Sequence, residues 1–533
     1  MRQTFITHAA SIQGVIALTS DQTLVEYGAD TGAANRAAHY ALKITDANAI
    51  VSLIKLANCP LYQNQISFWP ISGGRNFGYG TAQPVDARSI ILDLSALKKI
   101  TLDLRTQTAC IEPGVTQSDL ANAVASAKAN LLVPVTGAGP HGTILGNALD
   151  GGYGLTPFMD HFNAVSVWEG VWGNGTSFGH VYNDMRCEAM AKGWAAGTGP
   201  SPASLLRQGN FGIVTRATVQ LARAPESTRL VVFVWHSDAE FEESQDALSR
   251  LIEELPNLTG VIMMNARRML ATKKRGTLAH APSLADDRDV YLNREIEQQR
   301  IAPWSGLGTV FGARSVVSSV IKDLKRRLPL CQVLSFSPER IDTLKTIASL
   351  IPTRYFSVIQ QQIESLGDAL SMLEGRPNSN FLQLAYAINK VTVAGADANP
   401  AKDGQGILWY APLVPFNIRD VRQFRKIMSI SLLAHGFDPL LALTTRSSRV
   451  LSAPIPILFD KSDPADVLRA KECYRYLVDI GLRFGWPPYR IGIEYMDQLG
   501  LPAGCPTVKT HQSLKSVLDP HDVVAPGRYT FTK

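Results

Sequence analysis

The sequence lacks the patterns that mark several large classes of protein. Its six cysteines lie far apart, so no pair has the C-x-x-C spacing of a zinc or redox site. It has no run of about 18 uninterrupted apolar residues that would predict a membrane span. Its N-terminus has no basic stretch followed by a long apolar run, as a secretory leader would. We therefore expect reduced thiols, no metal, no membrane association and a cytoplasmic protein.

The chain also lacks a strong excess of charge. It has 52 basic and 46 acidic residues, a net charge of +6, and its basic residues are scattered. Because nucleic-acid binding needs a clustered basic face, we expect no nucleic-acid partner. Hydrophobic residues make up 45% and charged residues 18%, which excludes a disordered chain. At about 150 residues per domain, the length suggests two large or three to four small domains.

The first part of the chain alternates short β-like runs with helical segments. A helix is predicted at 46–56, where Asp46 offers an N-cap, and another at 117–127, where Ser118 and Asp119 offer capping groups. The β-like runs lie at 40–44, 66–71, 89–94, 98–104, 108–114 and 210–222.

Beyond the segment 223–227, which contains a proline, the pattern changes. A β-like run at 228–236 opens a region in which strands alternate with longer helices. The clearest helices are predicted at 238–254 and 464–484, and Gly485 is a natural end for the second. These patterns predict an α+β fold in two lobes.

Two glycine-rich stretches stand out. The loop 73–80 has four glycines and Arg75. Glycine lets backbone N–H groups approach an anion, and arginine is a forked donor suited to phosphate, so the loop favours a diphosphate cradle. The alternative is a tight hairpin with an incidental arginine. The second stretch, 134–156, contains a G-x-G-x-x-G string at 137–142, but Pro140 disfavours the helix that a Rossmann site requires.

Because both stretches lie in one α+β region, they suggest an extended anionic cofactor that lies across two loops. Six segments, in order, then resemble the vanillyl-alcohol oxidase and para-cresol methylhydroxylase family of FAD flavoproteins. The resemblance reaches from near residue 40 to the C-terminus. The segments are 70–80, 111–120, 146–161, 208–216, 488–498 and 518–529.

The resemblance implies a PCMH-type FAD-binding domain of two α+β subdomains, plus a cap domain with an antiparallel sheet flanked by helices. It implies that residues 1–223 and 489–533 bind FAD and that 224–488 form the cap, or substrate, domain. The cofactor-binding residues that it implies are Ser72, Gly73, Gly74, Arg75, Asn76, Gly146, Asn147, Gly212, Ile213, Val214 and Arg490.

The activity that the resemblance implies is oxidation of a para-substituted phenol, either an alkylphenol or a benzylic alcohol. Hydride passes to flavin N5, and the phenolate becomes a para-quinone methide. Tyr79, Tyr489 and Arg490 would bind the phenolate, and Asp160 would be the carboxylate near flavin N5. The residues alone leave two alternatives, that Asp160 caps a turn and that Tyr489 is an ordinary half-buried tyrosine.

The chain departs from its relatives at the positions that tether FAD covalently. The loop 73–75 has no histidine, the stretch 134–147 has no cysteine, and Ile407 stands where a linking histidine is expected. The segment 394–404 has no tyrosine. We therefore expect non-covalent FAD, with His39 as a remote alternative anchor.

A second departure concerns the substrate. The segment 447–454 lacks the family's paired histidines and ends in Pro454, and Pro456 lies two residues further on. The segment 197–210 lacks the usual Asp-Gly pair. Two alternatives therefore stay open. One is an FAD-dependent oxidase or dehydrogenase of another alcohol, a hydroxy acid, a sugar or a secondary-metabolite intermediate. The other is a flavin-binding partner subunit that has lost catalysis.

The resemblance also implies partners. We expect a small phenolic substrate, oxygen or a cytochrome as electron acceptor, and a homo-oligomer.

Overall fold

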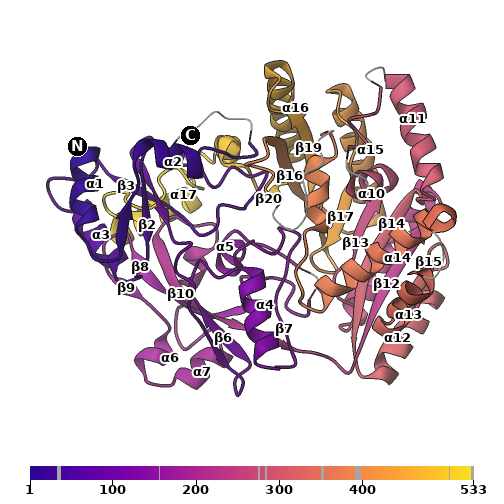
Figure 1. Cartoon of the computed structure of the whole chain (residues 1–533), viewed down its shortest axis with the longest axis horizontal. Coiled ribbons are helices and arrows are strands. Elements are labelled where there is room, and N and C mark those ends of the chain that lie inside the picture. Colours follow the sequence, from indigo (N-terminus) through magenta and orange to yellow (C-terminus); the bar gives the residue numbers. More distant parts are fainter. Residues whose placement is uncertain are drawn as a thin grey trace. The chain divides into compact units, whose positions relative to one another are not determined.

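The computed structural model describes residues 1–533 apart from 33–37, 155, 274–275, 283–284, 350–352, 390–397, 503 and 530–533. The chain divides into two compact units (Figure 1). Unit 1 comprises Met1–Gly154, Asp160–Arg223 and Gly492–Lys533, and unit 2 comprises Leu155–Met159 and Ala224–Ile491. Each unit combines helices with sheets, so the predicted α+β class is confirmed. The roles of FAD-binding domain and cap stay predictions.

Unit 1 contains two main sheets. The first has four strands, of which β2, β4 and β3 are parallel and β1 is antiparallel to β2. In spatial order they are β1 (Val15–Ala17), β2 (Ala41–Ile44), β4 (Ser89–Asp93) and β3 (Ser67–Ile71). The second is antiparallel, in the order β5 (Ile100–Asp103), β6 (Thr108–Ile111), β10 (Gly212–Gln220), β8 (Val165–Trp172) and β9 (Ser177–Phe178). A further pair joins β7 (Leu131–Leu132) to β11 (Ala222–Arg223).

Mostly short helices surround these sheets. They are α1 (Arg2–Ala10), α2 (Ser20–Tyr27), α3 (Ala49–Ala57), α4 (Gln117–Ser126), α5 (Ile144–Leu149), α6 (Val181–Asp184), α7 (Glu188–Gly193), η1 (Pro202–Leu206), η3 (Ile493–Leu499) and α17 (Pro506–Leu518). As Pro140 predicted, the string 137–142 forms turns rather than a helix, and α5 begins after it.

Two helices have their N-cap two residues from a predicted one, while the predicted capping role of Asp119 is confirmed. The N-cap of α3 is Asn48 rather than Asp46. The Asp46 carboxylate accepts a hydrogen bond from the Asn48 N–H, in the turn that precedes the helix. The N-cap of α4 is Thr116 rather than Ser118. Thr116 and Asp119 each accept from the other's backbone N–H at 3.1 Å, which is a capping box.

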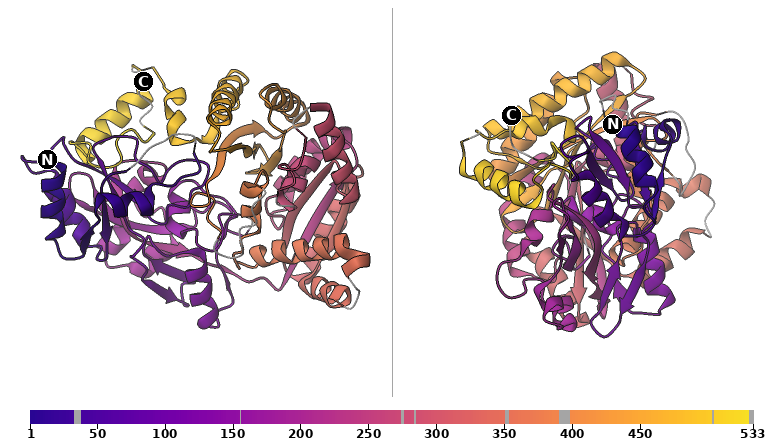
Figure 2. Two further views of the ribbon diagram at one scale, coloured as in Figure 1. Left: turned by 45° about the horizontal axis from the view of Figure 1, so that its top comes forward. Right: turned by 90° about the vertical axis from the view of Figure 1, so that its left-hand side faces the viewer.

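The end of the chain returns to the first sheet. Val524 forms a parallel bridge with Phe68 of β3, and helix α17 lies near the N-terminal elements (Figure 2). Asp519 ties this return together, because its buried carboxylate accepts from the N–H groups of Val523 and Val524 at 2.8 and 2.9 Å. Lys515 Nζ lies 2.6 Å from the same carboxylate.

Unit 2 is built on one antiparallel sheet of nine strands. Its order is β15 (Gln332–Phe336), β12 (Ser227–Trp235), β14 (Trp304–Gly312), β13 (Ile262–Asn265), β17 (Ala442–Thr445), β18 (Val450–Ser452), β16 (Gln405–Pro415) and β19 (Ile455–Asp460), with β20 (Pro488–Arg490) paired to β16. Its helices are α8 (Asp238–Glu243), α9 (Gln245–Glu254), α10 (Ala266–Lys273), α11 (Ala285–Gln298), α12 (Arg314–Arg327), α13 (Pro338–Ser349), α14 (Thr353–Leu373), η2 (Asn380–Tyr386), α15 (Ile418–Ala434) and α16 (Pro464–Arg483).

The helix predicted at 238–254 is interrupted. It consists of α8 and α9, separated by Ser244, whose hydroxyl donates to Glu240 O and accepts from Trp235 Nε1. The helix predicted at 464–484 is α16, and Gly485 follows it at a φ of +77°. None of the helices in the described parts of either unit is long and apolar enough to cross a membrane.

Pro454 divides a strand of unit 2 into β18 and β19 without shifting its register, and Pro456 lies within β19. Strands β18 and β19 pair with β16 in one continuous register, shown by the partners Leu413–Ser452 and Tyr410–Ile455. Between them Ala453 N–H still donates to Pro412 O at 2.9 Å, and Pro454 interrupts the ladder. Strand β20 pairs with the same part of β16, so it must occupy the other edge of that strand.

We expect Asp519→Ala to destabilise the fold. It leaves Lys515 partly buried without this counter-ion and two backbone N–H groups without acceptors, which should cost about 3–5 kcal/mol. The free energy of unfolding, measured by urea denaturation, is the readout. The control is Asp479→Ala, because the Asp479–Arg483 pair has side chains that are 54% and 70% exposed. It should cost below about 0.5 kcal/mol. Equal losses in the two variants would contradict the structural role of Asp519.

Candidate functional site

Unit 1 contains a cleft of about 1120 Å³, a volume that includes its open mouth. The loop after β3, the helix α5 and the start of β10 form its walls. Most of the residues that the sequence predicted for cofactor binding line it, namely Ser72, Gly74, Arg75, Asn76, Gly146, Asn147, Gly212, Ile213 and Val214. Gly73 packs behind this lining against Thr143, and Arg490 belongs to unit 2.

The two glycine-rich loops approach each other more closely than other residues would allow. A Cβ atom on Gly146 would lie 2.5 Å from Ser72 Oγ, and Gly74 has a φ of +62°. Ser72 Oγ and Thr143 Oγ1 are hydrogen-bonded at 2.7 Å, which joins the loops. Backbone amides therefore line the cleft without side chains in the way, as a bound diphosphate requires.

The charges in the cleft also suit an anion. Asp150 is buried, and its carboxylate accepts from Asn76 Nδ2 and pairs with Arg528 Nη2 at 2.5 Å. Arg75 lines the same cleft, so its lining includes the two guanidinium groups of Arg75 and Arg528 and the carboxylate of Asp150. Arg528 was not among the predicted site residues, although it lies in the last of the matched segments, beside Gly527. The residues present therefore fit the diphosphate of FAD.

Asp160 is engaged within unit 1. Its Oδ1 accepts from the N–H groups of Phe162 and Asn163 at 3.0 and 3.2 Å, and its Oδ2 pairs with Arg207 Nη1 at 3.0 Å. The guanidinium of Arg207 also lies 5.5 Å from the centre of the Phe162 ring. Asp160 thus has the turn-capping geometry that the sequence offered as an alternative. Its predicted role near flavin N5 stays a prediction.

Tyr79 is a buried residue of unit 1. Its carbonyl accepts from Ile493 N–H at 2.9 Å, and a Cβ on the next residue, Gly80, would lie 3.2 Å from Ile493 Cγ1. The returning C-terminal segment therefore fixes the position of Tyr79. Tyr489 and Arg490 belong to unit 2, so the predicted convergence of all four catalytic residues stays a prediction.

Tyr489 and Arg490 form a cationic cluster at the end of β20. Strand β20 is held against β16, with Arg490 opposite Ala411. Arg490 Nη2 donates to the Tyr489 hydroxyl at 3.2 Å. The guanidinium of a third residue, Arg446, lies 4.3 Å from the centre of the Tyr489 ring. Tyr489 is therefore flanked by two guanidinium groups.

The two arginines make Tyr489 more acidic. Burial by itself raises the pKa of a tyrosine, but the charges of Arg490 and Arg446 and their hydrogen bonds outweigh burial and lower the pKa of Tyr489 below its usual value. A more acidic hydroxyl is a stronger hydrogen-bond donor to an oxyanion. The cluster can therefore bind and stabilise a phenolate oxygen.

Sequence reasoning missed Arg446. Its Nε donates to the buried Ser452 Oγ at 2.9 Å, which aims the guanidinium at Tyr489. The sequence analysis marked 447–454 as unusual for the loss of histidines, and Arg446 directly precedes that segment. Its proximity to Tyr489 arises only from the pairing of β17 and β18 in the sheet, which no local pattern indicates.

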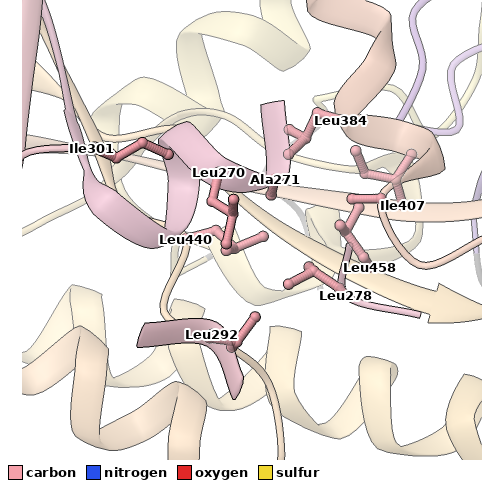
Figure 3. Close-up of a cluster of buried hydrophobic side chains, with 10 residues drawn as sticks. Leu270, Ala271, Leu278, Leu292, Ile301, Leu384, Ile407, Leu440 and Leu458 are labelled. Atoms are coloured by element: carbon pink, nitrogen blue, oxygen red, sulfur yellow. The ribbon is translucent and has the colours of Figure 1, made fainter. Parts of the chain in front are cut away.

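The residue types that would tether FAD are missing at the expected positions, since 73–75 has no histidine, 134–147 has no cysteine (although it contains His141) and position 407 is isoleucine. Ile407 is only 2% exposed and lies in an apolar cluster with Leu270 and Leu458 (Figure 3). His39 is exposed. Of the segment 394–404, the first four residues lie outside the described residues.

Comparison with known proteins agrees with this geometry. Residues 38–177 match a family described as "FAD binding domain". The chain is 27% identical over 475 residues to 1'-carboxy-chondrochloren decarboxylase of Chondromyces crocatus, covering 88% of this chain and 87% of that protein. It is 24% identical over 534 residues to the flavoprotein subunit of 4-cresol dehydrogenase (hydroxylating) of Pseudomonas putida, covering 96% and 92%.

Two solved structures have the same fold over the whole chain. One is p-cresol methylhydroxylase with substrate bound, at a TM-score of 0.83 and 20% identity, covering 100% of this chain and 97% of that one. The other is 4-ethylphenol oxidase from Gulosibacter chungangensis in complex with isoeugenol, at a TM-score of 0.85 and 20% identity, with the same coverage. The PCMH-type fold that the resemblance implied is thereby confirmed.

We expect Arg446→Met to raise the pKa of Tyr489, because one of the two cations beside the phenol is removed. The measurement is an ultraviolet titration of tyrosinate, with the Tyr489→Phe protein subtracted to isolate this residue. Arg449→Met is the control, since Arg449 is exposed and lies three residues after Arg446 in the chain. A titration that is the same in the Arg446→Met and unmodified proteins would contradict this electrostatic role.

Proposed function

Because this chain is an FAD-dependent oxidoreductase related to the p-cresol methylhydroxylase flavoproteins, we propose that it oxidises a para-substituted phenol at the benzylic carbon. The observation that supports the proposal most directly is the cluster of Tyr489, Arg490 and Arg446. A non-phenolic alcohol or a sugar offers no oxyanion for such a cluster to bind, so the cluster favours a phenol over those alternatives.

The cluster activates the substrate by binding its ionised form. A phenol has an ordinary pKa of about 10, so binding at neutral pH as phenolate requires strong stabilisation of the oxyanion. Arg490 provides a positive charge and donors, and Tyr489 provides an acidic hydroxyl. The resemblance adds Tyr79 as a further donor. The negative charge of a phenolate weakens the benzylic C–H bond toward hydride loss.

FAD, when bound, supplies the acceptor for the hydride. The backbone around Ser72–Asn76 and Gly146–Asn147 would hold its diphosphate, with Arg75 and Arg528 as counter-charges. The start of β10 would face its adenine end. Loss of a hydride, which consists of a proton and two electrons, converts the phenolate into a neutral para-quinone methide. Water can add to the benzylic carbon of this electrophile, or a proton can leave to give an alkene or an aldehyde.

We propose that Asp160 steers the water that adds to the quinone methide. Its carboxylate is held in one orientation by two backbone amides and by Arg207. Arg207 is then a positioning residue for Asp160. We expect oxygen or a cytochrome to re-oxidise the flavin. Because one relative is named as a flavoprotein subunit, both acceptors should be tested.

A second candidate is oxidative decarboxylation, favoured by the relative named as a decarboxylase. It shares the first step. If the carbon next to the benzylic position has a carboxylate, the electrons of the C–COO⁻ bond can form the new C=C bond as CO₂ leaves. The ring then regains its phenolate, so the sum is an alkene, CO₂ and two electrons on the flavin. Release of CO₂ distinguishes this outcome from hydroxylation.

We expect the FAD to be non-covalent, because the chain lacks the histidine at 73–75, the cysteine at 134–147 and the histidine at position 407 that the resemblance implies for a covalent tether. Precipitating the purified holoprotein in acid should leave the yellow colour in the supernatant. Yellow colour that stays with the washed pellet would show a covalent bond and contradict the prediction.

We expect para-alkylphenols to bleach the flavin of the holoprotein in the absence of oxygen. Tyr489→Phe should lower kcat/KM for these phenols by about 100-fold, the loss typical of removing one donor to an oxyanion. The control Tyr476→Phe alters a tyrosine of unit 2 that is 44% exposed and should have little effect. Re-oxidation by air or by cytochrome c identifies the acceptor. If no phenol of a para-substituted panel reduces the flavin, the phenol proposal is wrong.

A further inference from the structure

Unit 2 contains a buried arginine for which the described residues provide no counter-ion. Arg268 lies on α10 and is only 8% exposed. Its Nε and Nη1 atoms are buried and have no hydrogen-bond partner among the described residues. Its guanidinium lies 5.1 Å from the centre of the Trp409 ring, on the strand β16. A buried charge of this kind is costly unless another group compensates it.

The surroundings of Arg268 are apolar. The neighbours Leu270 and Ala271 on its helix belong to the buried cluster of Figure 3, and Trp409 packs against the same cluster. Burial alone lowers the pKa of the Arg268 guanidinium to about 9, with no opposing carboxylate in the described parts of the chain. Stacking on Trp409 offsets part of this cost, but it leaves the two nitrogens without acceptors. An anion would supply both acceptors and counter-charge.

Arg268 faces the same side of the sheet as the phenol-binding cluster. Side chains alternate along a strand, so Trp409, Ala411 and Leu413 of β16 share one face. Directly paired residues also share a face, which places Arg490, opposite Ala411, and Ser452, opposite Leu413, on that side.

Arg446, which is bonded to Ser452, lies on that side as well. Trp409 and Ala411 are two residues apart, a separation of about 7 Å along the strand. A ligand of modest length could therefore reach from the Tyr489 cluster to Arg268.

We propose that Arg268 recognises a carboxylate on the para substituent of the substrate, while the phenolic end binds at Tyr489 and Arg490. This inference rests on the proposed phenol oxidation. A single unpaired guanidinium matches the single negative charge of a carboxylate, and a phosphate would need further cations. The apolar surroundings and Trp409 suit the carbon chain between the two ends. The substrate class is thus a 4-hydroxyphenyl alkanoic acid.

The test compares a charged substrate with its neutral analogue on the holoenzyme. The pair is 3-(4-hydroxyphenyl)propanoate and its primary amide, with 4-ethylphenol as a phenol that has neither group. The quantity is the ratio of kcat/KM for the acid to that for the amide, measured by anaerobic flavin reduction. We expect the unmodified enzyme to prefer the acid by at least about 10-fold, as for a hydrogen bond to a charged group.

Variants of Arg268 then assign the preference. Arg268→Met should remove the preference and so lower the acid-to-amide ratio by at least about 10-fold, whereas Arg268→Lys, which keeps the charge, should retain more of it. The control is Arg267→Met on the same helix, because Arg267 pairs with Asp289 and Asp438 instead. It should leave the ratio near that of the unmodified enzyme. An unchanged ratio in Arg268→Met would overturn the proposal.

Two outcomes distinguish a failure of the proposed carboxylate site from a failure of the proposed phenol oxidation. If 4-ethylphenol reduces the flavin but the unmodified enzyme does not prefer the acid, the carboxylate site is wrong and phenol oxidation stands. This comparison needs no variant, so it holds even if Arg268→Met fails to fold. If none of the three phenols reduces the flavin, the phenol oxidation and the carboxylate site fail together.

Discussion

The pairing of β16 with the three-residue strand β20 is the constraint on which the cluster of Tyr489, Arg490 and Arg446 depends. Arg490 lies opposite Ala411, and this places Tyr489 beside a strand that β18 and β19 hold from the other edge. The interruption at Pro454 does not shift the register, so Ser452 stays opposite Leu413 and can orient Arg446. A slip of one residue would turn these side chains to the opposite face.

Charge compensation separates the arginines of this protein into two groups. Arg528 and Arg207 each pair with a carboxylate, Asp150 and Asp160, and so fix the shape of loops in unit 1. Arg446 and Arg490 instead flank the phenol side chain of Tyr489, and Arg268 stacks on an indole ring. Since a buried cation without an anion among the described residues is costly, Arg268 is consistent with an anionic ligand that compensates its charge.

A structural feature could be predicted from the sequence when neighbouring residues alone determine it. The glycine loops were found because close backbone approach and positive φ each restrict a position to glycine, as at Gly146 and Gly74. Helix caps were found to within two residues, because neighbouring polar groups compete for the same amides, as Asp46 shows. Arg446 and Arg268 were missed, since their importance comes from sheet pairing and burial. Neither sheet pairing nor burial produces a recognisable spacing of residues in the sequence.

The proposed chemistry links these features through the para-quinone methide. Its formation depends only on stabilising a phenolate and removing a hydride, so the cluster around Tyr489 can serve substrates with different substituents. What happens next depends on what lies beside the benzylic carbon. Water steered by Asp160 would add an oxygen, whereas a carboxylate on the adjacent carbon could leave as CO₂. A cation at Arg268 that selects carboxylated substrates would therefore determine which of these outcomes is available.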